Sequence, residues 1–133
     1  MNREIKFIGK SIYGEEWLYG SLVRIEEDRY AIIPNLNDIE IGKSIGMYEV
    51  YADTVGQFTG VKYDDIEIYE HDLVECAGVL CEVVYSDKIG SFVLLEVLSQ
   101  NLGNKPIGQM IDMFGIRYVG NIYDNPDLLK GDK

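Results

Sequence analysis

Short stretches of apolar residues, one of them alternating with charged residues, recur between turn residues along the chain and predict a protein built mainly of β-strands. Residues 4–8 alternate between apolar and charged side chains, the period-two pattern of a half-buried strand. Apolar-rich stretches at 17–23 and 30–33 complete a predicted three-stranded meander. Pro34 ends its last strand, because proline has no N–H for the ladder.

The middle of the chain interrupts this pattern. Residues 35–46 mix Asn, Asp, Gly and Ser with isolated isoleucines, a composition typical of a loop, and are the segment most expected to be mobile. Strands are expected again at 47–51 and 55–58. A turn is predicted at 59–60, directly after the second of these strands.

The polar run at 63–65 marks a change of register between two halves. We therefore expect an N-terminal β subdomain at 1–64, packed on a C-terminal subdomain at 65–133. A chain of 133 residues can bury a sufficient core without disulfides or metals, so the two subdomains are expected to form one cooperative unit.

The second half shows strand patterns and one helical pattern. After a tight turn at 68–72, apolar residues at i, i+3, i+4 and i+7 predict a short helix at 106–114. Asn125 and Pro126 have the cap and first-turn chemistry of a final helical turn. Strands are expected at 73–76, 80–85, 92–98 and 116–123. Turn residues every ~8–12 positions are typical of a sandwich or small barrel, so the predicted class is all-β with short helical turns.

Composition narrows the class of protein. No apolar run approaches the ~18 residues of a membrane-spanning helix, and the N-terminus lacks the apolar stretch of a secretory signal, so we expect a cytoplasmic protein with no membrane partner. The net charge of −11 disfavours direct nucleic-acid binding, which needs a cationic groove.

Residues suited to catalysis or cofactor binding are scarce. His71 is the single histidine and no Gly-x-Ser-x-Gly motif accompanies it, so we assign no catalytic residue. The Gly-Lys-Ser triplets at 9–11 and 42–44 lack the first glycine of a phosphate loop, so we expect no nucleotide or other cofactor.

Cys76 and Cys81 are interpreted as reduced strand residues, since a zinc site needs more ligands than they offer. Two hairpin registers remain open: a loop at 77–80 would set the cysteines opposite each other, and a turn at 77–78 would leave them offset. No metal is predicted. Seven acidic residues are interpreted as a solvated face, with a weak cation site as the alternative: Glu49, Asp53, Asp64, Asp65, Glu67, Glu70 and Asp72.

Several segments keep the order and spacing of known motifs. They lie at 5–10, 14–20, 54–60, 68–74 and 120–129, and in them the chain resembles the YopX family of phage and prophage proteins. The resemblance implies an SH3-like barrel for the second half and no established biochemical activity. This chain has Ile8 where the family usually has Arg, which removes any anion contact there, and His71 where the family usually has Gly, which is interpreted as a tolerated turn substitution.

Aromatic and polar residues inside these motifs are the candidates for partner contact. Trp17, Tyr19, Phe58 and Tyr69 are interpreted as core residues rather than binding hot spots, given their strand context. For the polar residues, hydrogen bonding within turns and strand ends is the favoured alternative. The possible partner contacts are Gln57, Thr59, Tyr69, Asn121 and Asn125.

The resemblance implies a phage or prophage protein, and the missing catalytic apparatus favours a non-enzymatic accessory role by protein–protein contact in the cytoplasm of the bacterial host. Apolar strands such as 92–95 carry no Pro or Lys to protect an edge, so a homo-oligomer is expected. Two alternatives remain: an acidic nucleic-acid mimic that inhibits a host DNA-binding protein, and a hydrolase that uses carboxylates in a cleft.

Overall fold

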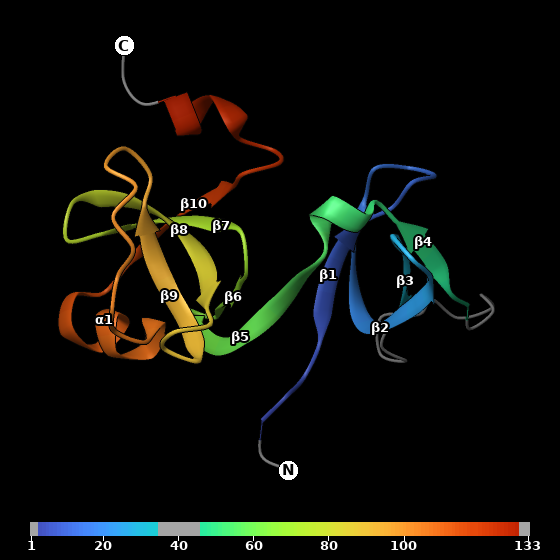
Figure 1. Ribbon diagram of the computed structural model, residues 1–133, viewed down its shortest axis with the longest axis horizontal. Helices are drawn as coiled ribbons and strands as arrows, with labels where there is room; N and C mark the ends of the chain where they lie inside the picture. Colours follow the sequence, from blue (N-terminus) through green and yellow to red (C-terminus); the bar gives the residue numbers. More distant parts are fainter. Residues whose placement is uncertain (1–2, 35–45, 131–133) are drawn as a thin grey trace. The chain divides into compact units, whose positions relative to one another are not determined.

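The computed structural model describes residues 3–34 and 46–130, which form two compact units. Unit 1 comprises residues 1–58 and unit 2 comprises residues 59–133 (Figure 1). The division falls within a strand, whereas the boundary predicted at 64–65 falls in the hairpin turn that follows this strand. Most of the predicted loop at 35–46 lies outside the described residues.

Unit 1 is an antiparallel meander, as predicted. Its strands follow one another in the sheet, and the 3-10 turn η2 (Ala52–Thr54) then returns the chain to pair with the free side of the first strand. An isolated bridge between Ser11 and Val50 ties the outer strand back to the residue after β1. The strands are β1 (Phe7–Lys10), β2 (Trp17–Glu26), β3 (Arg29–Pro34), β4 (Tyr48–Val50) and β5 (Gly56–Tyr63).

Strand β5 contributes residues to both units. Its first residues pair with β1, and its other neighbour in the sheet is β6 (Ile66–Tyr69) of unit 2. Before Gly60 the buried positions of β5 are Gly56 and Phe58. After Gly60 the position that packs against the core of unit 2 is Val61, so the face of the strand that is covered changes. Gly60 has a φ of +88°, a conformation that glycine adopts readily. The turn predicted at 59–60 is therefore wrong: these residues continue the strand, with a local change of the buried face.

Unit 2 is built on a four-stranded antiparallel sheet in the order β10-β7-β8-β9. The helix α1 (Ile107–Phe114) contacts β9 and β7, and Ile107 joins strand residues such as Ile68, Val74 and Val83 in one buried cluster. The remaining elements are β7 (Asp72–Cys76), β8 (Val79–Ser86), β9 (Ser91–Glu96), β10 (Arg117–Asn121) and the 3-10 helix η3 (Pro126–Lys130).

The mainly β class is confirmed, and so are the short helix and the final helical turn. The SH3-like barrel expected of the second half is not seen: among the described residues no closed barrel forms, because β9 and β10 are opposite edges of an open sheet. No helix in the described part of the chain is long and apolar enough to cross a membrane.

Candidate functional site

The tight turn between β6 and β7 brings together the most unusual polar groups of unit 2. Asp72 closes this turn, because its Oδ2 accepts a 2.8 Å hydrogen bond from the backbone N–H of Tyr69. Asp72 as a whole is 6 % exposed. The neighbouring His71 has a φ of +77°, the left-handed conformation that favours glycine.

The backbone of His71 joins two further strands to this turn. Its N–H donates to the carbonyl oxygen of Val83 in β8, at 2.8 Å. Its carbonyl oxygen accepts from the N–H of Ile122, directly after β10, at 3.2 Å. These two hydrogen bonds fix the turn to β8 and to the segment after β10, and the side chain of His71 lies near both.

The imidazole of His71 contacts carboxylates and one aromatic ring. Nδ1 lies 3.2 Å from Oε2 of Glu82 on β8, and Nε2 lies 4.0 Å from Oε2 of Glu70. The ring of Tyr123 meets the imidazole edge-on, with the centroids 5.7 Å apart and an interplanar angle of 79°. We call these residues the His71 cluster: Glu70, His71, Asp72, Glu82 and Tyr123.

The environment of the cluster raises two pKa values. Burial raises the pKa of Asp72 to about 7, more than the hydrogen bond from Tyr69 lowers it. Burial on its own would lower the pKa of His71, but the Glu82 hydrogen bond and the surrounding carboxylate charges outweigh it, so that the pKa is raised. The cluster can therefore take up and release protons near neutral pH.

The described residues give no support for a metal centre. In the ranges 3–34 and 46–130, no group of three or more His, Cys, Asp and Glu side chains is arranged to hold an ion. The seven acidic residues considered from sequence are divided between units: Glu49 and Asp53 belong to unit 1, and the other five to unit 2.

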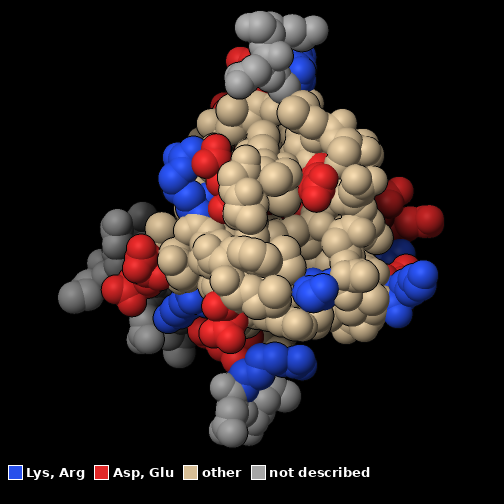
Figure 2. All heavy atoms as spheres, turned by 90° about the vertical axis from the view of Figure 1, so that its left-hand side faces the viewer, with Lys and Arg blue, Asp and Glu red and all other residues tan. Residues whose placement is uncertain are grey.

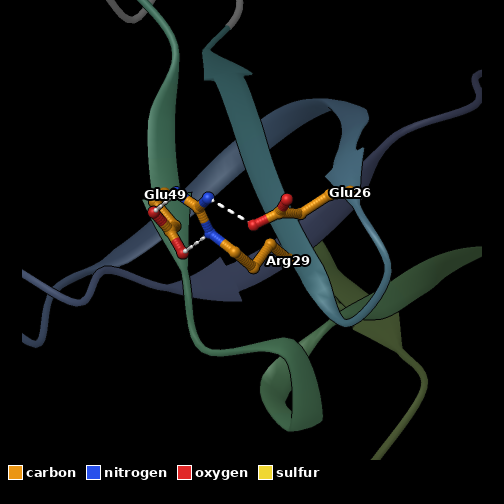
Figure 3. A network of polar contacts seen from close by, with 3 residues as sticks. All are labelled: Glu26, Arg29 and Glu49. Atoms are coloured by element: carbon orange, nitrogen blue, oxygen red, sulfur yellow. Dashed lines mark hydrogen bonds and ion pairs between the residues drawn. The ribbon is translucent and has the colours of Figure 1, made fainter.

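Glu49 is part of an ion-pair network across three strands. Arg29 on β3 donates from Nε and Nη2 to the two carboxylate oxygens of Glu49 on β4, at 3.1 and 2.9 Å, and from Nη1 to Glu26 on β2, at 2.6 Å (Figure 3). The hydrogen bonds from Arg29 hold the pKa of Glu49 below its usual range. The network connects β2, β3 and β4 and gives Glu49 a structural role.

The polar residues proposed as partner contacts make hydrogen bonds within the chain. Thr59 Oγ1 donates to the carbonyl oxygen of Ile68 at 2.7 Å, and the buried Tyr69 donates through its hydroxyl to Glu67 at 3.0 Å. Gln57 lies on β5 in the pairing with β1, opposite Phe7.

Asn121 and Asn125 shape the chain between β10 and η3. Oδ1 of Asn121 accepts from the N–H groups of Tyr123 and Asp124, and Oδ1 of Asn125 accepts from the N–H of Asn121. Gly120 allows this close approach, since a Cβ there would lie 2.1 Å from Oδ1 of Asn125. The segment positions Tyr123 against His71.

The cysteines adopt the offset register. Cys76 pairs with Val79 and Cys81 pairs with Val74, around a two-residue turn at Ala77 and Gly78. Both thiols are free and buried, and burial raises their pKa values, that of Cys81 to about 11. Thiolate chemistry is therefore suppressed, as expected of structural cysteines.

The aromatic residues of the motifs divide into buried and exposed. Phe58 and Tyr69 are 5 % and 4 % exposed, which confirms the core interpretation for these two. Tyr19 is exposed, so the interpretation is wrong there, because its strand position faces outward. Trp17 is half-buried beside Lys10, whose Nζ lies 5.7 Å from the centre of a Trp17 ring.

Unit 2 also presents a broad surface with few charges. Figure 2 shows an expanse of uncharged residues on one face, with most charged side chains toward its margin. Residues 89–116 comprise β9, the segment that follows it and α1. In this range the sequence has only three charged residues, Glu96, Lys105 and Asp112. We call residues 89–116 the low-charge segment. Its exposed apolar side chains are Ile89, Leu98, Leu102, Met113 and Phe114.

Sequence reasoning missed Glu82 and Tyr123 as partners of His71. Glu82 stands out as a charged residue within the apolar run of β8, but only the pairing of strands places it beside the turn at 70–71. Nothing in the spacing of Tyr123 indicates its contact.

Comparison with curated proteins and with solved structures gave no significant match. A family model described as YopX protein matches residues 5–130. This range takes in both units and nearly the whole chain, and the chain therefore belongs to the YopX family.

Proposed function

We propose that this protein is a non-enzymatic phage or prophage accessory protein that works in the bacterial cytoplasm by protein–protein contact and self-associates. The observation that supports it most is the low-charge segment of unit 2. In a chain with a net charge of −11, such a surface can lose its water without stripping hydration from many carboxylates. The exposed apolar side chains of this segment are of the kind that is found at interaction sites.

The composition of the segment fits an interface. Met113 and Phe114 at the end of α1 are 52 % and 53 % exposed, and Leu98 in the preceding segment is 71 % exposed. Aromatic residues and Met are enriched in interface cores, and charged residues are depleted there. Partner contact through this face should therefore depend little on salt.

The apolar face supports self-association better than an open strand edge does. The outer edge of β9 is partly paired by the chain that follows it, because Gly103 N–H donates to the Leu94 carbonyl oxygen and Glu96 N–H donates to that of Asn101. At the other edge of the sheet, β10 has a register shift between Tyr118 and Gly120, and such bulges discourage edge pairing.

Light scattering on purified protein tests the proposal. We expect the wild type to form a defined oligomer whose mass is insensitive to added salt, and Phe114→Glu to shift it toward the monomer. Tyr13→Glu is the matched control, since Tyr13 is a 78 % exposed aromatic residue of unit 1. In an affinity pull-down from host lysate, we expect the proteins captured by the wild type to be lost when the Phe114→Glu variant is used as bait. A monomeric wild type whose captured proteins are unchanged by Phe114→Glu would contradict the proposal.

A further inference from the structure

The His71 cluster joins parts of unit 2 that are distant in the sequence. The turn at 70–71, β8 and the segment after β10 all meet at His71, through two backbone hydrogen bonds and two side-chain contacts. Since the backbone bonds do not depend on protonation, the charge of the imidazole acts through Glu82 and the ring of Tyr123.

Four groups face this imidazole from the elements packed around it. Glu82 comes from β8, Glu70 from the turn, Asp72 from the start of β7 and Tyr123 from the segment after β10. Three of the four are carboxyl groups. No Lys or Arg appears among the groups that act on His71 in the described part of the chain.

The balance of charge in the cluster depends on one proton. When His71 is protonated, Nδ1–H donates a charge-assisted hydrogen bond to Glu82, and Glu70 gains a cation 4.0 Å away. When His71 is neutral, Glu82 and Glu70 lose the positive charge beside them. Like charges gathered around one partly buried group then repel without a cation among them.

We propose that the His71 cluster is a proton-operated clasp, in which the protonated imidazole holds the segment from Ile122 to Asn125 against the β6–β7 turn and β8. Loss of the proton loosens the contact between His71 and Tyr123 and so the anchoring of this segment. The clasp lies wholly within unit 2. It does not depend on the partner contact proposed above.

Because His71 is the single histidine of the chain, its ring signals in ¹H–¹³C NMR spectra are unambiguous. We expect the wild-type ring to titrate above the ordinary histidine value. The ring protons of Tyr123 and the amide of Ile122 should shift with the same midpoint, and amide exchange at Ile122 should speed up above this midpoint by more than the intrinsic pH dependence. Asp72 can add a second step to the coupled titration, which Asp72→Asn should remove.

Two glutamate variants separate the clasp from a general effect of charge. Glu82→Gln should lower the His71 midpoint and weaken the coupled response of Tyr123. Glu96→Gln, on β9, removes a carboxylate that accepts from Ser99 and is expected to leave the midpoint in place. An ordinary or lowered midpoint in the wild type would overturn the proposal. So would a midpoint unmoved by Glu82→Gln, or Tyr123 and Ile122 signals that ignore the titration.

Discussion

The buried carboxyl of Asp72 lowers the free energy of unfolding at neutral pH. The pKa of Asp72 is about 7 in the folded chain and near 3.8 when unfolded. Between these values the folded protein holds a proton that the unfolded chain releases, so the free energy of unfolding falls as pH rises through this window. The raised pKa of His71 acts in the same direction, since its contribution is lost as pH rises through the folded value.

We predict that Asp72→Asn flattens this dependence. The amide keeps an oxygen to accept from Tyr69 but cannot ionise, so the variant should be more stable than wild type at about pH 8, by on the order of 1–3 kcal/mol, and the difference should shrink steadily down to about pH 4, where the unfolded carboxyl also holds a proton. Denaturant unfolding at both pH values measures this. Asp112→Asn, at an exposed position of α1, is the control and should show the wild-type slope.

Phe58 and Trp17 should differ in how much they stabilise the fold. Phe58 is 5 % exposed, and Phe58→Ala should cost about 3–5 kcal/mol of unfolding free energy, as for other buried aromatic residues. Trp17 is only half-buried, so Trp17→Ala should cost clearly less. Equal losses in denaturant melts would show that Trp17 has a core role after all.

At the scale of elements, the period of the side chains predicted much of the fold. Short apolar stretches bounded by turn residues located β2, β3, β8 and β9, and the helical period located α1. Local spacing could not decide the hairpin register at Cys76 and Cys81. The backbone decides it, since Ala77 and Gly78 both have positive φ values, +52° and +79°, which a two-residue type I′ turn requires.

This turn gives a prediction. Ala77 occupies a left-handed position that costs residues with a Cβ about 1–2 kcal/mol, and Asn tolerates it better. Ala77→Asn should therefore raise stability by roughly 0.5–1 kcal/mol, measured by thermal unfolding. Ala77→Pro, which locks φ at a negative value, should lower it. If Ala77→Asn destabilised the protein, the turn would have another conformation.

The candidate site was less accessible to sequence reasoning than the elements. The motif around His71 drew attention to the turn, and its positive φ explains why glycine suits this position. The partners Glu82 and Tyr123 come from β8 and from beyond β10, and only the pairing of β7 with both strands brings them together. Tertiary contacts of this kind leave no spacing that can be read along a single sequence.

At the scale of the whole molecule, the sharing of β5 predicts that the two units unfold together. Residues of this one strand belong to each unit, so loss of order in one should release the strand from the other. Fluorescence of Trp17 reports on unit 1 and the NMR signal of His71 on unit 2, each being the single residue of its kind. We expect one common midpoint in urea. Separate midpoints would show that the units are independent.

The change of buried face at Gly60 makes the chain sensitive to the number of residues between Phe58 and Val61 in β5. Phe58 is buried in unit 1, whereas Val61 packs against the core of unit 2, and the two residues are an odd number of positions apart. Since side chains alternate along a strand, deleting one residue between them would turn a whole set of apolar side chains outward, whereas deleting two would restore the alternation. Natural length variation in this protein should therefore avoid this strand, and any that occurs there should come in pairs of residues.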